Sequence, residues 1–182
     1  DKNMRSRNRV VVTGMGVLAP NGTGLKAFWR SLVAGESGIG PITLFDSSGF
    51  KTRIAGEVKG FDPLDYMDPK WKPRRMGRHT QLAYAATQMA LKDADFDPAT
   101  SKLPTVLPVC IGVSSSAFDV IENGFRELRD LGPRRINSGV VRNCQPQAAA
   151  HLIAEKLGVE THATTISSAC NSGIDAIASA AS

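Results

Sequence analysis

The chain has 182 residues, 42% of them hydrophobic, which is enough for one sizeable globular core. No apolar run approaches the roughly 20 residues of a membrane-spanning helix, so no membrane association of that kind is expected. The net charge of +5 suggests an acidic partner. The three cysteines are odd in number and lack metal-site spacing. They argue against a disulfide framework and predict a reducing compartment, the cytoplasm or an organelle matrix.

The chain starts with a basic, polar stretch, residues 1–8, that lacks the apolar centre of a signal peptide. We interpret it as a leader or an artificial remnant before a domain spanning 9–182. The run RVVVT (9–13) predicts a buried first strand. It continues into GMGVLA, which resembles a dinucleotide-binding glycine turn, but PNG (20–22) interrupts the chain before a helix can begin. The sequence therefore disfavours a nucleotide site.

A helix is expected from Thr23, a capping residue, to Gly35, a typical stop. Its apolar stripe consists of Leu25, Phe28, Trp29, Leu32 and Val33. Residues 36–78 are rich in Gly, Pro and Asp and predict an insertion. Within it, the alternating sequence KTRIAGEV (51–58) predicts a short surface hairpin or edge strand.

Helices and strands then alternate along the chain. A helix is predicted from His79 to Ala94, a core strand over 105–114 and another helix near 117–131. The inward residues of the first helix should be Leu82, Ala85, Ala86, Met89 and Ala90. QPQAAAHLIAEKLG predicts a further helix that stops at its final glycine, Gly158, and TTI (164–166) the end of a buried strand. This order predicts an α/β fold with a mostly parallel sheet covered by helices.

Cys170 lies between that strand and the last predicted helix. Nothing bulky occurs over 167–173, so a turn is expected before the helix begins. The apolar positions of the helix are Ile174, Ile177, Ala178 and Ala181. Its other faces are also small, which predicts a buried central helix with Cys170 at its N-terminus. Unpaired N–H groups and the helix dipole favour a thiolate there, so Cys170 is the candidate nucleophile.

The alternative is that Cys170 is a small buried hydrophobe, as free cysteines mostly are. Cys110, in the apolar run VLPVCIGVS, and Cys144, in RNCQPQ, have no comparable setting. We interpret these two cysteines as structural.

Four stretches, taken in order, carry a resemblance to a known family: RVVVTGMGVLAPNG (9–22), AGESGIGPITLFDSSGFKTRIAGEV (34–58), LGPRRI (131–136) and SSACNSG (167–173). Together they resemble the β-ketoacyl-acyl-carrier-protein synthases of the elongating type, over nearly the whole chain. The resemblance implies the N-terminal half of a thiolase-like fold, a layered α/β structure with a mostly parallel sheet and a buried central helix. Half of such a fold would leave apolar faces of its sheet and central helix uncovered.

The resemblance also implies a chemistry, used in fatty-acid elongation or related polyketide synthesis. An acyl group passes from an acyl carrier protein to Cys170, a malonyl thioester loses carbon dioxide, and the resulting enolate attacks the acyl thioester. The family builds its oxyanion hole partly from the backbone N–H of this cysteine. No cofactor or metal is implied.

In this family two histidines and a lysine from a second half complete the site, so the chain alone should be inactive. Its own histidines, His79, His151 and His162, do not match those positions, and we interpret them as structural.

Pocket and dimer residues follow from the same resemblance. Ser115 matches the gate of the acyl pocket, where relatives carry a bulkier side chain. Val140 matches a pocket position contributed to the neighbouring subunit. The family is homodimeric, with the strand over 161–167 pairing across the twofold axis.

Two arginine pairs match stretches that flank the pantetheine tunnel of relatives: Arg74, Arg75, Arg134 and Arg135. Because carrier proteins are acidic, these pairs predict the carrier-protein docking surface. Gly77 replaces an aspartate that commonly precedes the next helix, which should weaken the cap of that helix.

Parts of the sequence also suggest two other classes of function. A non-catalytic homologue, such as a chain-length factor, would keep the fold and lose the nucleophile, and the presence of Cys170 argues against it. The basic stretch KWKPRRMGRH (70–79) suggests a nucleic-acid-binding module. That stretch is short, interrupted by proline and unaccompanied by a recognised nucleic-acid fold, so no nucleic-acid partner is predicted.

Overall fold

The computed structural model describes residues 9–98, 100, 106–158 and 161–182. Its centre is a parallel pair of strands, β5 (Leu107–Gly112) and β6 (Thr161–Ile166), in which Gly112 pairs with Ile166. The predicted parallel sheet is therefore confirmed. Residue 105, the first of the predicted core strand, lies outside the described residues.

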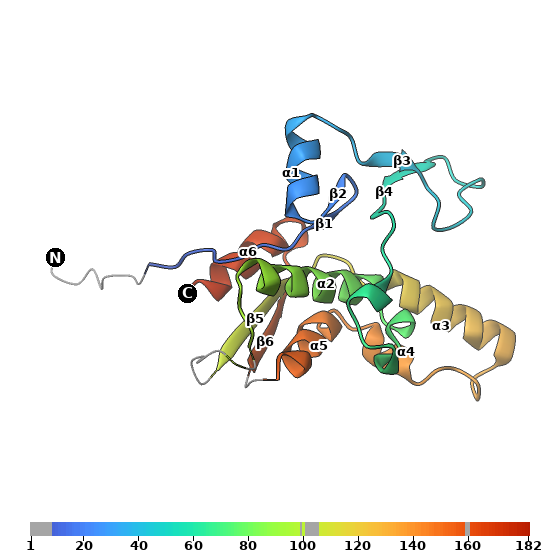
Figure 1. Ribbon diagram of the computed structural model, residues 1–182. Helices are drawn as coiled ribbons and strands as arrows, with labels where there is room; N and C mark the ends of the chain where they lie inside the picture. Colours follow the sequence, from blue (N-terminus) through green and yellow to red (C-terminus); the bar gives the residue numbers. More distant parts are fainter. Residues whose placement is uncertain (1–8, 99, 101–105, 159–160) are drawn as a thin grey trace, which may run out of the picture.

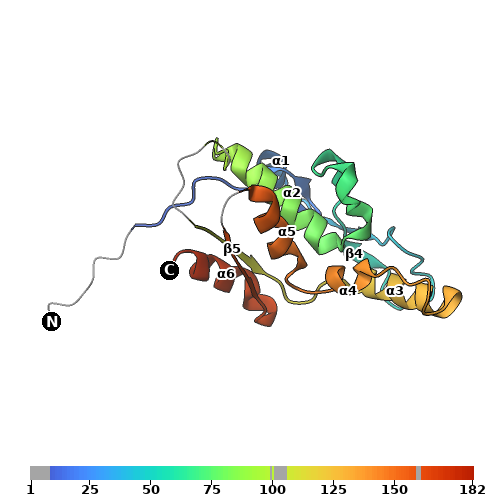
Figure 2. The same cartoon turned by 90° about the horizontal axis from the view of Figure 1, so that it is seen from below.

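Helices cover both faces of this pair of strands. Helix α6 (Ser172–Ala180) packs on one face and α5 (Ala148–Leu157) on the other, with β5 between them (Figure 2). Helix α2 (Arg78–Asp93) packs against α5. The result is the layered α/β arrangement that the sequence predicted.

Helix α3 (Phe118–Leu131) extends to the end of the molecule farthest from the C-terminus (Figure 1). The remaining elements are β1 (Leu18–Ala19), β2 (Gly22–Thr23), α1 (Leu25–Val33), β3 (Ile39–Pro41), β4 (Ile54–Gly56), α4 (Gly139–Asn143) and the 3₁₀ turns η1 (Pro63–Asp65), η2 (Pro69–Trp71), η3 (Pro73–Arg75) and η4 (Ala169–Asn171). Strand β4 pairs antiparallel with β3, which lies outside 51–58, so of the two structures predicted for 51–58 the edge strand is confirmed and the hairpin is not. Within the described ranges, no helix has the length and apolarity needed to cross a bilayer.

The core lies where α2 and α5 meet the sheet. Its buried hydrophobic members are Met67, Tyr84, Val109, Leu152, Ile153 and Leu157. Trp71 packs edge-on against Tyr84, with ring centroids 5.7 Å apart, and the Lys156 ammonium lies 4.6 Å from the Trp71 ring centroid. The tryptophan that suggested a nucleic-acid module therefore takes part in core packing.

The predicted first strand, 9–13, is not formed. These residues pair with none of the described strands, and Val10, Val11 and Val12 are 63%, 63% and 76% exposed. A β-branched run becomes a strand only where a neighbouring strand satisfies its N–H and C=O groups, and no described strand does so here.

The two glycines that follow pack against α2. A Cβ on Gly14 would lie 2.3 Å from the carbonyl oxygen of Ala90, and one on Gly16 would lie 1.9 Å from that of Ala86. Only glycine allows two backbones to approach so closely. Close packing thus accounts for the glycines that resemble a phosphate-binding turn.

Helix α1 differs from the prediction at its cap and at its apolar stripe. Its N-cap is Gly24, with φ 84° and no side-chain cap, and Thr23 belongs to β2. Trp29 and Leu32 are 62% and 51% exposed, while Ser31 is the buried residue of this helix. The periodicity identified the helix but not what covers it.

Helix α2 begins and ends within one residue of the prediction, but its buried face is rotated. Its buried residues are Thr80, Gln81, Tyr84 and Ala85, whereas Leu82, Ala86, Met89 and Ala90 are half-buried. Gln81 Nε2 donates to the carbonyl oxygens of Pro73 and Met76, both at 3.0 Å. These bonds allow a polar side chain to occupy the interior in place of an apolar one.

The N-terminus of α2 is capped from another helix. Its N-cap, Gly77, has no side chain to offer, as expected. The backbone N–H of Arg78 donates instead to Asp119 Oδ2 at 2.9 Å, and Asp119 lies in the first turn of α3. The missing local cap is therefore replaced by a contact across the fold.

We expect Asp119→Ala to lower the free energy of unfolding of the full-length protein by about 1 kcal/mol, because it leaves this N–H without its carboxylate partner. Urea denaturation measures the change. The control is Glu122→Ala on the same helix, whose exposed i,i+4 ion pair with Arg126 is worth only about 0.3–0.5 kcal/mol. Equal losses in the two variants would contradict the capping role of Asp119.

Candidate active site

Cys170 lies just beyond the carboxyl end of the parallel strands. Strand β6 ends at Ile166, the 3₁₀ turn η4 contains Cys170, and α6 begins at Ser172. The predicted order of strand, turn and helix is therefore confirmed, with Cys170 in the turn and separated from the helix by its N-cap residue, Asn171.

A glycine in the neighbouring strand brings α6 close to the sheet. A Cβ on Gly112, the last residue of β5, would lie 2.2 Å from the carbonyl oxygen of Ser172. The start of α6 can rest on the end of β5 only because this position is glycine. The first turn of the helix is thus fixed at the sheet edge where Cys170 emerges.

Hydrogen bonds hold the turn around Cys170. The Ser168 N–H donates to Ser172 Oγ at 2.9 Å, and the Ser172 hydroxyl donates to the Ala169 carbonyl oxygen at 2.7 Å. Ala169 has φ 55°, in the left-handed region that is unfavourable for residues with a Cβ. Cys170 therefore follows directly after a strained residue in a tightly bonded turn.

The three cysteines differ in accessibility. Cys170 is exposed, whereas Cys110 and Cys144 are half-buried. Cys110 Sγ lies 4.0 Å from Ser179 Oγ, and Cys144 Sγ donates to the Val141 carbonyl oxygen at 3.4 Å. Cys170 is thus the most accessible of the three thiols, and the alternative of a buried Cys170 does not hold in this structure.

Helix α6 is covered on one face only. Ser172 and Ala176 are buried on the side toward the sheet, but Ile174 and Ile177 are 69% and 70% exposed. The helix predicted to be buried on every side is therefore exposed on its isoleucine face in this chain, because close contact with β5 selects small residues on the inner face. The uncovered apolar face expected for half of such a fold is confirmed.

A cavity of about 470 Å³ brings several predicted residues together. Its lining includes Arg74, Arg75, Arg135 and Val140, from segments far apart in the sequence. Arg134 does not line it. The arginine pairs were predicted to share one surface, and three of the four guanidinium side chains meet at this cavity.

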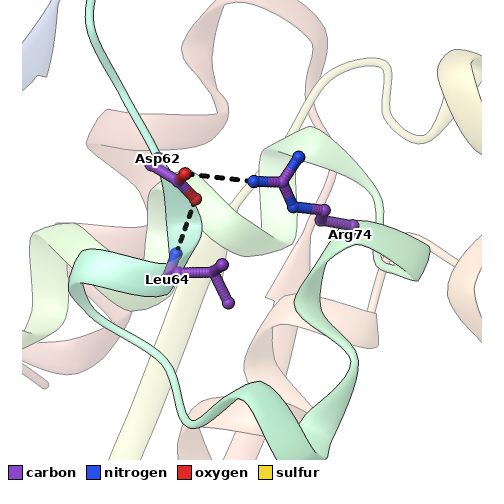
Figure 3. A network of polar contacts seen from close by, with 3 residues as sticks. All are labelled: Asp62, Leu64 and Arg74. Carbon is purple, nitrogen blue, oxygen red and sulfur yellow. Dashed lines mark hydrogen bonds and ion pairs between the residues drawn. The ribbon is translucent and has the colours of Figure 1, made fainter.

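Arg74 is held in place by an ion pair. Its Nη2 lies 3.1 Å from Asp62 Oδ2, and Asp62 Oδ1 accepts from the Leu64 N–H at 3.0 Å at the start of η1 (Figure 3). Arg75 and Arg135 form no ion pair with the part of the chain that the structure describes. Their charges are therefore available to a partner.

Two acidic residues also line this cavity, and both are engaged in bonds to the backbone. Asp119 accepts from the N–H of Arg78, and Glu127 Oε2 accepts from the N–H of Asn137 at 3.2 Å. These bonds use part of the hydrogen-bonding capacity of each carboxylate.

The two predicted pocket residues lie apart. Ser115 is exposed just beyond the end of β5, and because β5 and β6 run parallel, it leaves the sheet at the same edge as Cys170. Val140 lies in α4 and packs on α3, where its Cγ1 would be 2.9 Å from a Cβ placed on Gly124. Ser115 does not line the cavity that Val140 lines.

The resemblance to the β-ketoacyl synthases predicts that Ser115→Phe shortens the longest acyl chain accepted by the full-length protein, because a ring would narrow the approach at the sheet edge. Short primers should keep kcat/KM within about threefold. A kcat/KM series from acetyl to palmitoyl carrier protein measures this, with Ser115→Ala as the control that adds no bulk. A uniform loss across all chain lengths would contradict a gating position.

None of the three histidines lies in the cysteine turn. His79 is half-buried at the start of α2, its Nε2 is 3.2 Å from Thr80 Oγ1, and its buried Nδ1 has no partner among the described residues. Burial lowers the pKa of His79, against the opposing effect of the Asp119 carboxylate. The ring is therefore neutral near pH 7. His151 and His162 are exposed.

Asp175 was not among the site residues predicted from the sequence. Its carboxylate accepts hydrogen bonds from the side chains of Ser168 and Asn171, on either side of Cys170. One signal was present in the sequence, since Asp175 is the single charged residue between 164 and 182.

A cysteine turn at the carboxyl edge of a parallel sheet, with helices on both faces, fits a thiolase-like protein. Residues 7–182 match the family described as Beta-ketoacyl synthase, N-terminal domain. The chain belongs to the β-ketoacyl synthase family.

The relatives of this chain include a 3-oxoacyl-[acyl-carrier-protein] synthase and a polyketide β-ketoacyl synthase. The chain is 37% identical over 180 residues to 3-oxoacyl-[acyl-carrier-protein] synthase 2 of Vibrio cholerae, covering 97% of this chain and 42% of the relative. It is 34% identical to the Granaticin polyketide putative beta-ketoacyl synthase 1 of Streptomyces violaceoruber, covering 93% of this chain and 41% of the relative.

A solved structure described as the ishigamide ketosynthase/chain length factor has a TM-score of 0.81 at 31% identity, covering 96% of this chain and 45% of that chain. The fold is accordingly thiolase-like. The chain spans less than half the length of these relatives.

Proposed function

We propose that the protein condenses an acyl thioester with malonyl-acyl-carrier protein to give a β-ketoacyl-carrier protein, through acylation of Cys170. The observation that carries this proposal is the exposed Cys170 on its strained turn, in a chain of the β-ketoacyl synthase family. The names of its relatives, a 3-oxoacyl-[acyl-carrier-protein] synthase and a polyketide β-ketoacyl synthase, support the same reaction class.

The reaction proceeds through two acyl transfers. The Cys170 thiolate attacks the carbonyl carbon of an acyl-carrier thioester, and the carrier leaves as its thiol after taking up a proton. Malonyl-carrier then loses carbon dioxide, and the resulting enolate attacks the acyl-Cys170 carbonyl. The carbon–carbon bond forms as the carbon–sulfur bond breaks, which regenerates the thiolate.

Each attack forms a tetrahedral oxyanion that needs hydrogen-bond donors. The backbone N–H of Cys170, in the turn before α6, is the donor we assign within this chain. Two histidines and a lysine outside residues 1–182 complete the site. The chain by itself is then inactive in condensation.

The proposed partners are an acyl carrier protein and a second copy of the protein. Arg74, Arg75, Arg134 and Arg135 form the docking surface for the carrier. Strand β6 pairs with β5 on one side, and no described strand pairs with its other edge, which supports a homodimer through 161–167. The free cysteines support a reducing compartment, the cytoplasm or an organelle matrix.

Acyl transfer in the full-length protein tests this function. After incubation with acyl-carrier protein, mass spectrometry should find the acyl mass on the peptide that contains Cys170. Addition of malonyl-carrier should then release carbon dioxide and the β-ketoacyl product. Absence of both the adduct and the product would overturn the proposal.

A chain-length-factor role is the second candidate, because a neighbouring solved structure is described as a ketosynthase/chain length factor. Such a subunit would need a separate ketosynthase for condensation. The full-length protein assayed without any other ketosynthase separates the two functions, and activity in that assay favours the synthase.

A further inference from the structure

The carboxylate of Asp175 bridges the two sides of the cysteine turn. Asp175 lies in the first turn of α6 and is half-buried. It accepts from the Ser168 hydroxyl through Oδ2 and from Asn171 Nδ2 through Oδ1, the latter at 3.0 Å. Ser168 immediately precedes Ala169-Cys170, and Asn171 immediately follows it. One side chain therefore fixes both ends of the dipeptide that carries the thiol.

The turn needs such a constraint because its backbone is strained. Ala169, with φ 55°, occupies a left-handed conformation that costs an alanine about 1 kcal/mol or more. A strained conformation persists only where surrounding contacts favour it over the relaxed alternatives. Ser172 supplies two of these contacts and Asp175 supplies the other two.

The chemistry of the partners explains why this residue is a carboxylate. The Asn171 amide nitrogen is a donor, and the Ser168 hydroxyl also donates here, so both require an acceptor. An ionised carboxylate offers two acceptor oxygens, whereas an amide at position 175 offers only one. Asp175→Asn therefore removes the negative charge and one of the two acceptor atoms while keeping the size of the side chain, and the new amide nitrogen can only donate to the Ser168 hydroxyl.

We propose that Asp175 is a positioning residue for Cys170, holding the turn so that the thiol meets the acyl carbonyl and the Cys170 N–H meets the developing oxyanion. This inference rests on the proposed acylation of Cys170. A positioning role predicts that loss of Asp175 lowers the rate of acyl transfer at saturating substrate more than it weakens substrate binding, because Asp175 holds the turn and does not bind the substrate.

The test compares Asp175→Asn and Asp175→Ala with the unaltered full-length protein. The rate of acyl transfer from carrier protein at saturating substrate should fall about tenfold in Asp175→Asn and up to about a hundredfold in Asp175→Ala. KM should stay within about threefold of the unaltered value in both variants. Alkylation of Cys170 by iodoacetamide, which requires an accessible thiol but no aligned oxyanion donor, should stay within about threefold. Glu122→Gln, the same acid-to-amide change at an exposed position of α3, should leave both rates unchanged.

A mutant cycle distinguishes positioning through this network from a general structural role. Ser168→Ala and Asn171→Ala should each slow acyl transfer, and neither should slow it further once Asp175 is alanine. Full additivity, or Asp175→Ala with kcat within twofold of the unaltered protein, overturns the proposal. A loss of kcat that appears only together with a lowered Tm and a loss of Cys170 alkylation also overturns the proposal.

A parallel assay of Cys170→Ala distinguishes failure of this inference from failure of the proposed function. If Cys170→Ala still transfers acyl groups, the proposed function is wrong. If Cys170→Ala is inactive and the Asp175 variants are fully active, only the positioning role of Asp175 is wrong.

Discussion

Cys170→Ala is expected to reduce acyl transfer by the full-length protein roughly 10⁴-fold or more, because it removes the nucleophile on which both half-reactions depend. The fold should survive the change. Cys170 is exposed and its sulfur makes no hydrogen bond within the described residues, so the free energy of unfolding should change by less than about 0.5 kcal/mol. Single-turnover acyl transfer and urea denaturation measure the two effects.

The other two cysteines are the matched controls for this experiment. Cys110→Ala and Cys144→Ala remove half-buried thiols that contact Ser179 and the Val141 carbonyl oxygen. Each should keep acyl transfer within a few-fold, and limiting electrophile should label Cys170 first in the unaltered protein. Preferential labelling of Cys144 would contradict the assignment of the nucleophile.

Local patterns in the sequence were enough to locate most elements of the fold. The apolar period of 148–157 and the stop at Gly158, which has φ 70°, produced α5 as predicted. The run at 9–13 shows the limit of such patterns. It has the composition of a strand, but pairing and burial depend on a neighbour that local sequence does not specify.

Long-range contacts explain the other differences. The cap of α2 comes from Asp119 in α3, so inspection of Gly77 alone could only predict a weak cap. The small residues of α6 predicted a helix buried on every side, whereas only the face that packs closely on Gly112 is buried. Periodicity identifies the apolar face of a helix, and packing decides whether that face is buried or exposed.

The candidate site likewise has some features that could be predicted from the sequence and others that could not. The setting of Cys170 was visible because strand, turn and helix follow one another in the sequence. The bridge formed by Asp175 was not visible, because it depends on the conformation of the turn between Ser168 and Asn171. The cavity that joins Arg74, Arg75 and Arg135 depends on how η3 lies beside α3 and its following loop.

The basic surface at that cavity leads to the second large expected effect. Arg74→Glu combined with Arg135→Glu replaces two positive charges on one cavity wall with two negative ones. An acidic carrier protein would then meet repulsion where the unaltered surface attracts it. We expect kcat/KM for carrier-linked substrate to fall about a hundredfold, a change of about 2.7 kcal/mol.

The kinetic signature distinguishes docking from damage to the site. A free pantetheine thioester carries no acidic protein surface, so the double variant should turn it over almost unchanged. Salt screens charge attraction, so KM of the unaltered protein for the carrier substrate should rise with ionic strength more steeply than KM of the variant. Arg30→Glu, the same change at an exposed position of α1, should behave like the unaltered protein. Equal losses for the carrier-linked and the free substrate would show that these arginines support the active site itself and not the docking of a carrier protein.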